Sequence, residues 1–201
     1  MRRLFVAAGV LAVTAWGAVS AAAATLDIVP GGTTSVEVTA DLDGLGLSAG
    51  TIGTATAEVV DGNLVVDFPI TGGSVTDGVA MIEHEGSGVE IFLTSDPSSS
   101  ISLTNFLIDT GEGTVSSDVN GIANAVVFDF GTIDDSGIQL NFAGFLAGAL
   151  TAAFGAPNTT GGEFGIANTN PEIAPIPLPA GAPLLIAGLA AFAFLRRRKV
   201  A

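Results

Sequence analysis

Glu83-His84-Glu85 places the only histidine of the chain between two carboxylates. Neighbouring side chains along a strand point to opposite faces, so His84 faces away from both glutamates. Ala80 and Ile82 share the face of His84 and are apolar. We therefore expect a half-buried, hydrogen-bonded histidine. The alternative, a metal ligand, needs further ligands that the sequence does not place.

Two pairs of aspartates are candidate calcium ligands. Asp41 and Asp43 precede a glycine, as in the first half of a calcium loop, but the third ligand and the terminal glutamate of such a loop are missing. A turn is therefore expected there. Asp134 and Asp135 form a second possible calcium corner, because carboxylates without a cationic competitor attract divalent ions. We therefore predict no cofactor, with bound calcium as the alternative.

The residues do not indicate catalysis. The chain contains no Cys, which excludes thiolate nucleophiles and disulfides, and its single histidine is poorly placed for a Ser–His triad. A carboxylate pair for glycoside cleavage cannot be assigned from sequence. We predict no catalytic residue and no enzymatic activity. A polysaccharide hydrolase remains the remote alternative.

Charge is distributed very unevenly along the chain. All 20 carboxylates lie between Asp27 and Glu172. The six basic residues lie near the termini and are Arg2, Arg3, Arg196, Arg197, Arg198 and Lys199. The body thus has 20 carboxylates against no Lys or Arg, a formal charge of −20. Nucleic acid is excluded as a partner, because its binding depends on cationic side chains at phosphates.

The N-terminus has the three parts of a signal peptide. Arg2 and Arg3 precede a long apolar run, and Ala22 and Ala24 supply the small residues of a cleavage site before Thr25. We predict a signal peptide over residues 1–24 and export by general secretion.

Between the termini, apolar residues alternate with polar ones at the period of half-buried strands. The predicted inward-facing sets are Val36 and Val38; Leu64, Val66, Phe68 and Ile70; Val89, Ile91 and Leu93; Val126, Phe128 and Phe130; and Ile138, Leu140 and Phe142. Turn signals rich in Gly, Asn and Asp separate these runs. The sequence therefore predicts an acidic all-β domain over 25–156, an antiparallel β-sandwich or open barrel.

Three segments depart from simple alternation. Ile101 and Leu103 start on one face and Phe106 continues on the other, which predicts a bulge near Thr104-Asn105. Apolar residues at spacings of three and four predict one short helix at about 143–154, which caps the core. Residues 157–175 are rich in Asn, Thr, Gly and Pro, and we predict a flexible linker there, with a possible last strand at 164–166.

The C-terminus also has three parts. A proline-punctuated motif comes first, followed by an apolar run that ends at Leu195 and by a basic end. The motif is Ile176, Pro177, Leu178, Pro179 and Ala180, and the basic end is Arg196, Arg197, Arg198 and Lys199. Residues 178–195 are just long enough for a transmembrane helix, with the basic end kept cytoplasmic. A plain membrane anchor is the alternative to a sorting signal.

This tail, residues 176–201, resembles the VPLPA-type sorting signal of the PEP-CTERM family, with Ile176 in place of the usual Val. The resemblance implies recognition by an exosortase, a membrane-embedded cysteine protease-transpeptidase that cuts near the proline motif. It also implies transient residence in the inner membrane of a Gram-negative bacterium and an association with exopolysaccharide.

Residues 68–119 loosely resemble segments of secreted bacterial β-proteins, including the haem-binding HtaA modules of surface proteins. No functional residue is carried over from this resemblance, because the chain contains no Tyr, a common haem ligand.

Together these features predict an exported cell-envelope or extracellular-matrix protein, sorted at its C-terminus, with a structural or adhesive role in the exopolysaccharide layer. The alternative is a secreted β-module that binds a ligand or calcium.

Overall fold

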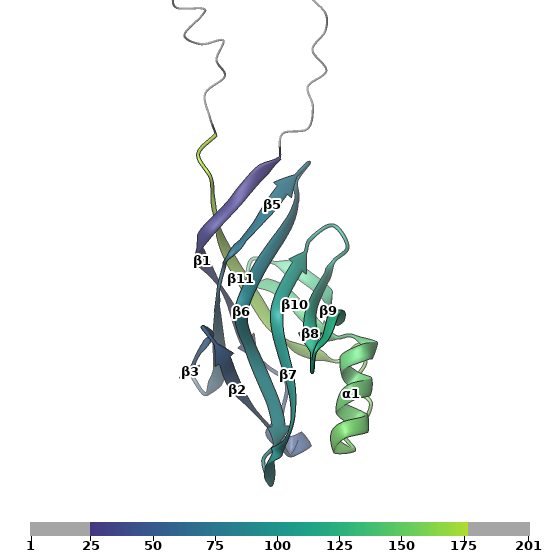
Figure 1. Cartoon of the computed structure of the whole chain (residues 1–201). Coiled ribbons are helices and arrows are strands. Elements are labelled where there is room, and N and C mark those ends of the chain that lie inside the picture. Colours follow the sequence, from purple (N-terminus) through teal and green to yellow (C-terminus); the bar gives the residue numbers. More distant parts are fainter. Residues whose placement is uncertain (1–24, 177–201) are drawn as a thin grey trace, which may run out of the picture.

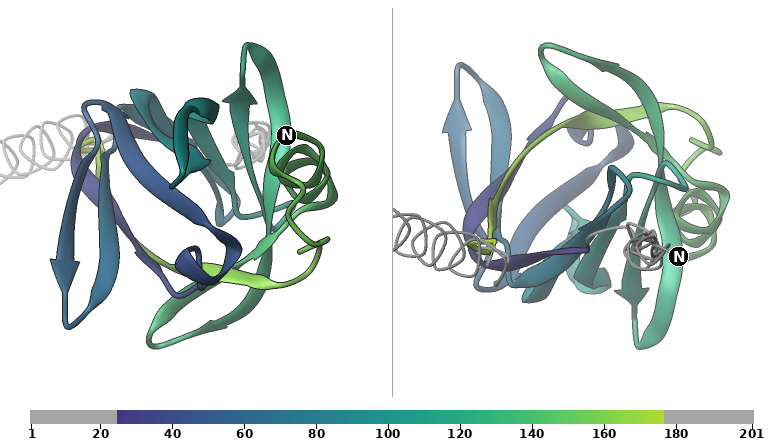
Figure 2. Two further views of the ribbon diagram at one scale, coloured as in Figure 1. Left: turned by 90° about the horizontal axis from the view of Figure 1, so that it is seen from below. Right: turned by 90° about the horizontal axis from the view of Figure 1, so that it is seen from above.

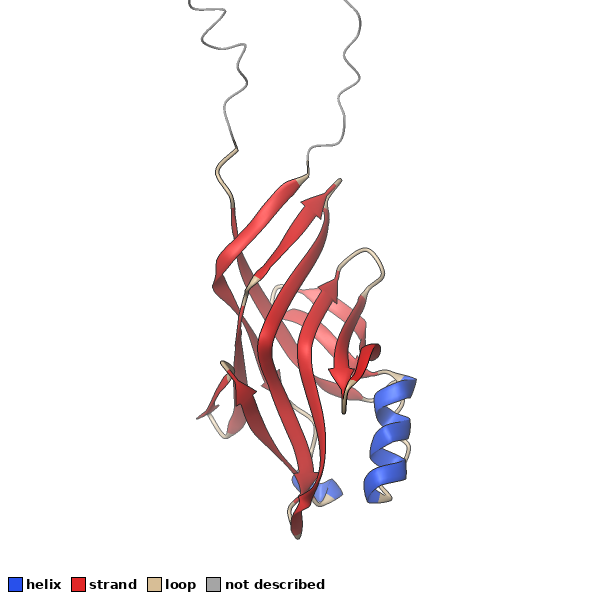
Figure 3. Ribbon diagram, in the orientation of Figure 1, coloured by secondary structure: helices blue, strands red, loops and turns tan. Residues whose placement is uncertain are grey.

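The computed structural model describes residues 25–176, and most of this part of the chain is β-strand (Figures 1 and 3). The elements in chain order are β1 (Leu26–Val38), the 3-10 helix η1 (Asp43–Leu45), β2 (Leu47–Gly53), β3 (Thr56–Val60), β4 (Asn63–Pro69), β5 (Gly72–Thr76), β6 (Val79–Leu93), β7 (Asp96–Asp109), β8 (Thr114–Val119), β9 (Ile122–Asp134), β10 (Gly137–Phe142), α1 (Gly144–Phe154) and β11 (Glu163–Ile173). The predicted all-β class, antiparallel with one short α-helix, is confirmed within these residues.

The sheet closes on itself because its first and last strands pair. From β5 to β11, each strand pairs with the next along the chain, and β11 then pairs with β1 from Ile28↔Ile173 to Val38↔Gly165. β5 in turn pairs with the start of β1, over Leu26–Ile28. Figure 2, which looks along the strands, shows the resulting ring.

The ring splits below β5. β5 pairs with one edge of β1 only at the start of that strand. β4 pairs with the same edge farther along, over Thr33–Val38. On β6, β5 pairs with the first third of the strand and β2 with residues 87–93. Among the strands of residues 25–176, β3 pairs with β4 alone and β2 with β6 alone. The lower half of the sheet therefore ends in two strand edges, β2 and β3, that are not paired with each other.

Inward-facing residues follow the predicted alternation on most strands. Val36 and Val38 of β1, Val66 and Phe68 of β4 and Ile91 of β6 are all buried. Asp61 and Asn120 have positive φ in the turns expected at Asp61-Gly62 and Asn120-Gly121, and Asp77 has positive φ in a further turn that was not predicted from the sequence.

The bulge predicted near Thr104-Asn105 is confirmed. The β7–β8 register shifts between Thr104 and Leu107, and Asn105 has a φ of 55°. Its amide anchors the irregular backbone: Oδ1 accepts from the Gly86 amide at 2.9 Å, and Nδ2 donates to Asp118 at 2.8 Å. Ile101, Leu103, Phe106 and Ile108 are consequently all buried.

The alternation predicted for β9 is wrong at two adjacent positions, Val126 and Val127. Val126 is 39% exposed, whereas Val127 is fully buried together with Phe128. The β8–β9 register shifts between the partners Val115↔Phe128 and Ser116↔Val126, so Val127 is skipped. α1 packs against β9, and the Ala143 amide donates to the Val127 carbonyl at 3.0 Å. Val127 is therefore buried by a local bulge and by the packing of α1, although strict alternation places it on the outer face.

The predicted helix is confirmed as α1, which packs against β7 and β9 and buries Leu146, Ala147 and Leu150. It ends at Gly155, whose φ of 66° allows the left-handed C-cap.

The linker predicted over 157–175 differs from the structure. Residues 163–173 form β11, which pairs with β10 on one side and β1 on the other. Its polar composition misled the prediction: Asn168 and Asn170 are exposed on the outer face of the ring, whereas Thr169 faces inward and is hydrogen-bonded to Thr34. A last strand at 164–166 was correctly predicted, but the observed strand is much longer than these three residues.

The predicted signal peptide and C-terminal transmembrane helix lie outside the described residues. Within residues 25–176, no helix is long and apolar enough to cross a membrane.

Candidate functional site

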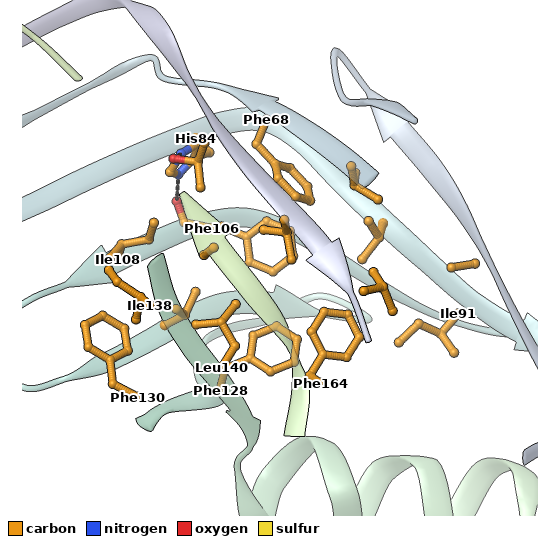
Figure 4. Close-up of a pocket in the computed structure, with 18 of the residues that line it drawn as sticks. Phe68, His84, Ile91, Phe106, Ile108, Phe128, Phe130, Ile138, Leu140 and Phe164 are labelled. Atoms are coloured by element: carbon orange, nitrogen blue, oxygen red, sulfur yellow. Dashed lines mark hydrogen bonds between the residues drawn. The ribbon is translucent and has the colours of Figure 1, made fainter. Parts of the chain in front are cut away.

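A cavity of about 50 Å³ lies inside the ring (Figure 4). Its lining residues come from most strands of the sheet and are Thr34, Val36, Val38, Leu42, Ala49, Val66, Phe68, His84, Val89, Ile91, Phe106, Ile108, Val115, Phe128, Phe130, Ile138, Leu140, Phe164 and Ala167. Only Thr34 and His84 carry polar side-chain atoms. The cavity is several-fold smaller than the roughly 300–1,000 Å³ of small-molecule sites, so the interior is a packed core with a residual void.

Aromatic rings fill much of the interior. Phe68 and Phe106 meet edge to face with centroids 5.1 Å apart, and Phe128 stacks on Phe164 at 4.5 Å. Figure 4 shows His84 beside this group of rings, and its own ring centroid lies 6.3 Å from that of Phe68. Such contacts stabilise the core by about 0.5–1.5 kcal/mol each beyond the burial of area.

His84 lies on β6, between β5 and β7, and is 1% exposed. Glu83 and Glu85 are exposed on the opposite face of the strand, as the sequence predicted. The histidine is therefore hydrogen-bonded as expected but more deeply buried than the half-buried position inferred from Ala80 and Ile82.

Two successive hydrogen bonds connect His84 to β1 and β11. His84 Nε2 lies 2.8 Å from Thr34 Oγ1, and Thr34 donates in turn to Thr169 Oγ1 at 2.9 Å. With the Thr34 hydroxyl proton donated to Thr169, Nε2 carries the imidazole proton. Nδ1 then faces the Phe106 carbonyl oxygen at 3.3 Å, a contact that becomes a hydrogen bond only when the ring is doubly protonated.

Burial lowers the pKa of His84 to about 4, and the opposing effect of the Phe106 carbonyl is smaller. No other titratable side chain lines the cavity. His84 is consequently neutral at neutral pH, and its role in the described structure is to satisfy Thr34 within an apolar core.

The four aspartates considered as calcium ligands lie in two separate turns. Asp41 accepts a hydrogen bond from the Gly44 amide at 2.8 Å, and Asp43 begins η1. Asp134 accepts from the backbone and side chain of Ser136, which lowers its pKa, and Asp135 is exposed beside it. Among the described residues, no three acidic or histidine side chains gather as a metal site would require. Asp41 and Asp134 thus stabilise their turns by hydrogen bonds, and calcium binding stays a prediction.

One serine pattern was overlooked in the sequence. Residues 46–50 read G-x-S-x-G, the pattern that surrounds the nucleophile of α/β-hydrolases. Here Ser48 lies within β2 instead of on a strand-to-helix turn, and its hydroxyl pairs with Thr94 Oγ1 at 2.8 Å. His84 is buried inside the ring, so the two side chains do not form a nucleophile–base pair.

Thr34 and Thr169 were not identifiable from the sequence. They are separated by 135 positions and meet only because β1 and β11 pair. The signal-cleavage residues Ala22 and Ala24, all but the first residue of the sorting motif, and the basic end lie outside the described residues. Ile176, the first motif residue, is 68% exposed.

Comparison with known proteins supports the fold. No protein-family model and no curated protein matches the chain. The C-terminal domain of HtaA from Corynebacterium glutamicum matches in structure with a TM-score of 0.51 and 13% identity, over 74% of this chain and 99% of that domain. The predicted likeness to HtaA-like β-modules is thus confirmed at the level of the fold.

Proposed function

We propose that this chain is an exported envelope protein, sorted at its C-terminus by an exosortase, whose β-body has a structural or adhesive role in the exopolysaccharide layer of a Gram-negative bacterium. The observation that carries the proposal is the position of the two ends of the body. β1 and β11 pair at Ile28↔Ile173, and the Ala174 amide donates to the Asp27 carbonyl at 2.9 Å. Both ends therefore leave the body side by side.

This arrangement suits a module that is held at one end. The sorting motif begins at Ile176, only three residues after β11 ends at Ile173, a reach of about 10 Å when extended. β11 is hydrogen-bonded to β1 on one edge and to β10 on the other, so a force applied to the C-terminus acts on a strand that is paired on both edges. A body attached through this end presents the far half of the ring, with α1, η1 and the β3–β4 hairpin, to its surroundings.

The surface of the body is consistent with a hydrated matrix. Residues 25–176 carry 20 carboxylates and no cationic side chain, which favours solubility and excludes anionic surfaces as direct partners. The small interior cavity and the paired hydroxyl of Ser48 give no support for a hydrolase.

The intact mass of the protein, measured by cell fraction in its native cells, tests the proposal. We expect a mature chain that begins near Thr25 and ends near Pro177–Pro179, outside the inner membrane. Replacing Pro177 and Pro179 with Ala should leave an uncut chain in the membrane fraction. Replacement of Pro157, which precedes β11, is the matched control and should not. A native chain that runs to Ala201 and stays in the membrane would overturn exosortase sorting and leave a plain anchor.

A further inference from the structure

β3 is a strand whose outer edge is unpaired. It pairs with β4 in continuous register from Thr56↔Asp67 to Val60↔Asn63, and no described strand pairs with its other edge. Figure 2 shows the β3–β4 hairpin extending away from the ring. That edge borders the split in the sheet, where β2 ends the other side.

β3 is ordered without contributing to the core. All five of its residues are exposed, and Val59 is 72% and Val60 43% exposed. Fixing a backbone costs about 1–2 kcal/mol per residue, and here no buried side chain offsets that cost. Edge strands commonly carry charged side chains, Pro or a bulge that blocks further pairing; β3 has one charged side chain, Glu58, and no Lys, Pro or bulge.

The two faces of β3 differ in chemistry. Ala57 and Val59 pair with Val66 and Leu64, which face the interior of the ring, so they extend the apolar inner face. On the outer face, Glu58 lies in one row with Val65 and then Glu37. A strand added at this edge would place alternate side chains beside Val59 on one face and beside Glu58 on the other.

Charge indicates what kind of strand fits. The body has a formal charge of −20 and residues 25–176 contain no Lys or Arg, so a second copy of the body would be repelled. A cationic segment would be attracted and would supply the counter-charge that the chain itself lacks there. We propose that the free edge of β3 binds, by strand addition, an extended segment of a partner protein in which apolar and basic residues alternate.

A synthetic peptide provides the test. The probe is an acetylated seven-residue peptide that alternates Lys and Val, labelled for fluorescence anisotropy and added to the full chain at low salt. We expect saturable binding, slower amide hydrogen exchange at residues 56–60, and weaker binding at 0.5 M NaCl, where charges are screened. The same peptide with Glu in place of Lys should not bind. N-methylation of alternate amides should abolish binding while keeping charge and side chains, because the ladder cannot form.

Charge reversal locates the site. Glu58→Lys should weaken peptide binding about fivefold, as expected for loss of a surface ion pair and its replacement by repulsion. Glu112→Lys, in the β7–β8 turn, makes the same change in net charge elsewhere and should have little effect. Equal effects of the two variants, binding of the N-methylated peptide, or protection outside residues 56–60 would overturn the proposal. Dimerisation of the full chain through β3 would overturn it as well, in favour of a second copy.

Discussion

At the residue scale, His84 makes the stability of the body depend on pH. The unfolded histidine titrates near its ordinary value of 6.5, whereas burial lowers the folded pKa to about 4. The unfolded state therefore binds the proton first as the pH falls, and stability is lost progressively between about pH 6.5 and 4. From pH 7 to 5 the free energy of unfolding should fall by about 2 kcal/mol through this residue alone.

Urea unfolding of the wild type and of His84→Leu checks this expectation. The variant should lose much less stability between pH 7 and 5, although it removes the hydrogen bond between Thr34 and the imidazole and starts lower at pH 7. Parallel curves for the two proteins would show that His84 does not titrate in this window.

At the element scale, the β1–β11 pair that closes the ring tolerates no side chain at Gly165. A Cβ at this position would collide with the backbone carbonyl oxygen of Glu37 on β1. We expect Gly165→Ala to destabilise the body by roughly 1–3 kcal/mol, because one of the two strands must shift.

Gly148 in α1 is the matched control, since a Cβ there meets nothing within 4 Å. Gly148→Ala should stabilise the body by about 0.5–1 kcal/mol through helix propensity. Thermal unfolding of both variants measures the difference. A Gly165→Ala protein as stable as the wild type would mean that the ring can open at β1–β11 without loss.

At the scale of the whole molecule, self-repulsion of the carboxylates should make stability rise with salt. The Debye length falls from about 30 Å at 0.01 M to 3 Å at 1 M, so the repulsion is largely removed. We expect the Tm to rise on the order of 5 °C over this range of NaCl. An unchanged Tm would show that the charges are too far apart to matter.

Comparing the Tm in CaCl₂ with the Tm in NaCl distinguishes calcium binding from charge screening. At matched ionic strength, a larger rise of the Tm with CaCl₂ than with NaCl would support a bound ion. Loss of that extra rise in Asp41→Asn/Asp43→Asn or in Asp134→Asn/Asp135→Asn would identify the turn that binds it.

Local chain chemistry was enough to predict the class of the fold. The period of two in β1, β4 and β6, the turns at Asp61-Gly62 and Asn120-Gly121 and the helix at about 143–154 are properties of short segments, and each was correct. The turn signals at 72–73 and 86–88 were wrong, because these glycines lie within β5 and β6. The bulge at Asn105 could also be predicted from the sequence, because a shift of one residue in the alternation moves the apolar residues to the other face of the strand. The same reasoning failed at Val127, since burial there comes from α1, which the segment itself does not contain.

Tertiary structure alone decided everything that depends on partners distant in sequence. Residues 163–173 look like a linker by composition and form a strand because β1 and β10 provide two edges for it to pair with. Thr34 meets Thr169 through the same closure and also hydrogen-bonds to His84 of β6. The free edge of β3 exists because β4 and β2 diverge below β5. The predicted export and sorting signals are contiguous terminal segments, whereas the closure of the ring and its free edge arise from long-range pairing. Pairing of strands depends on which edges meet in space, and no local pattern specifies that.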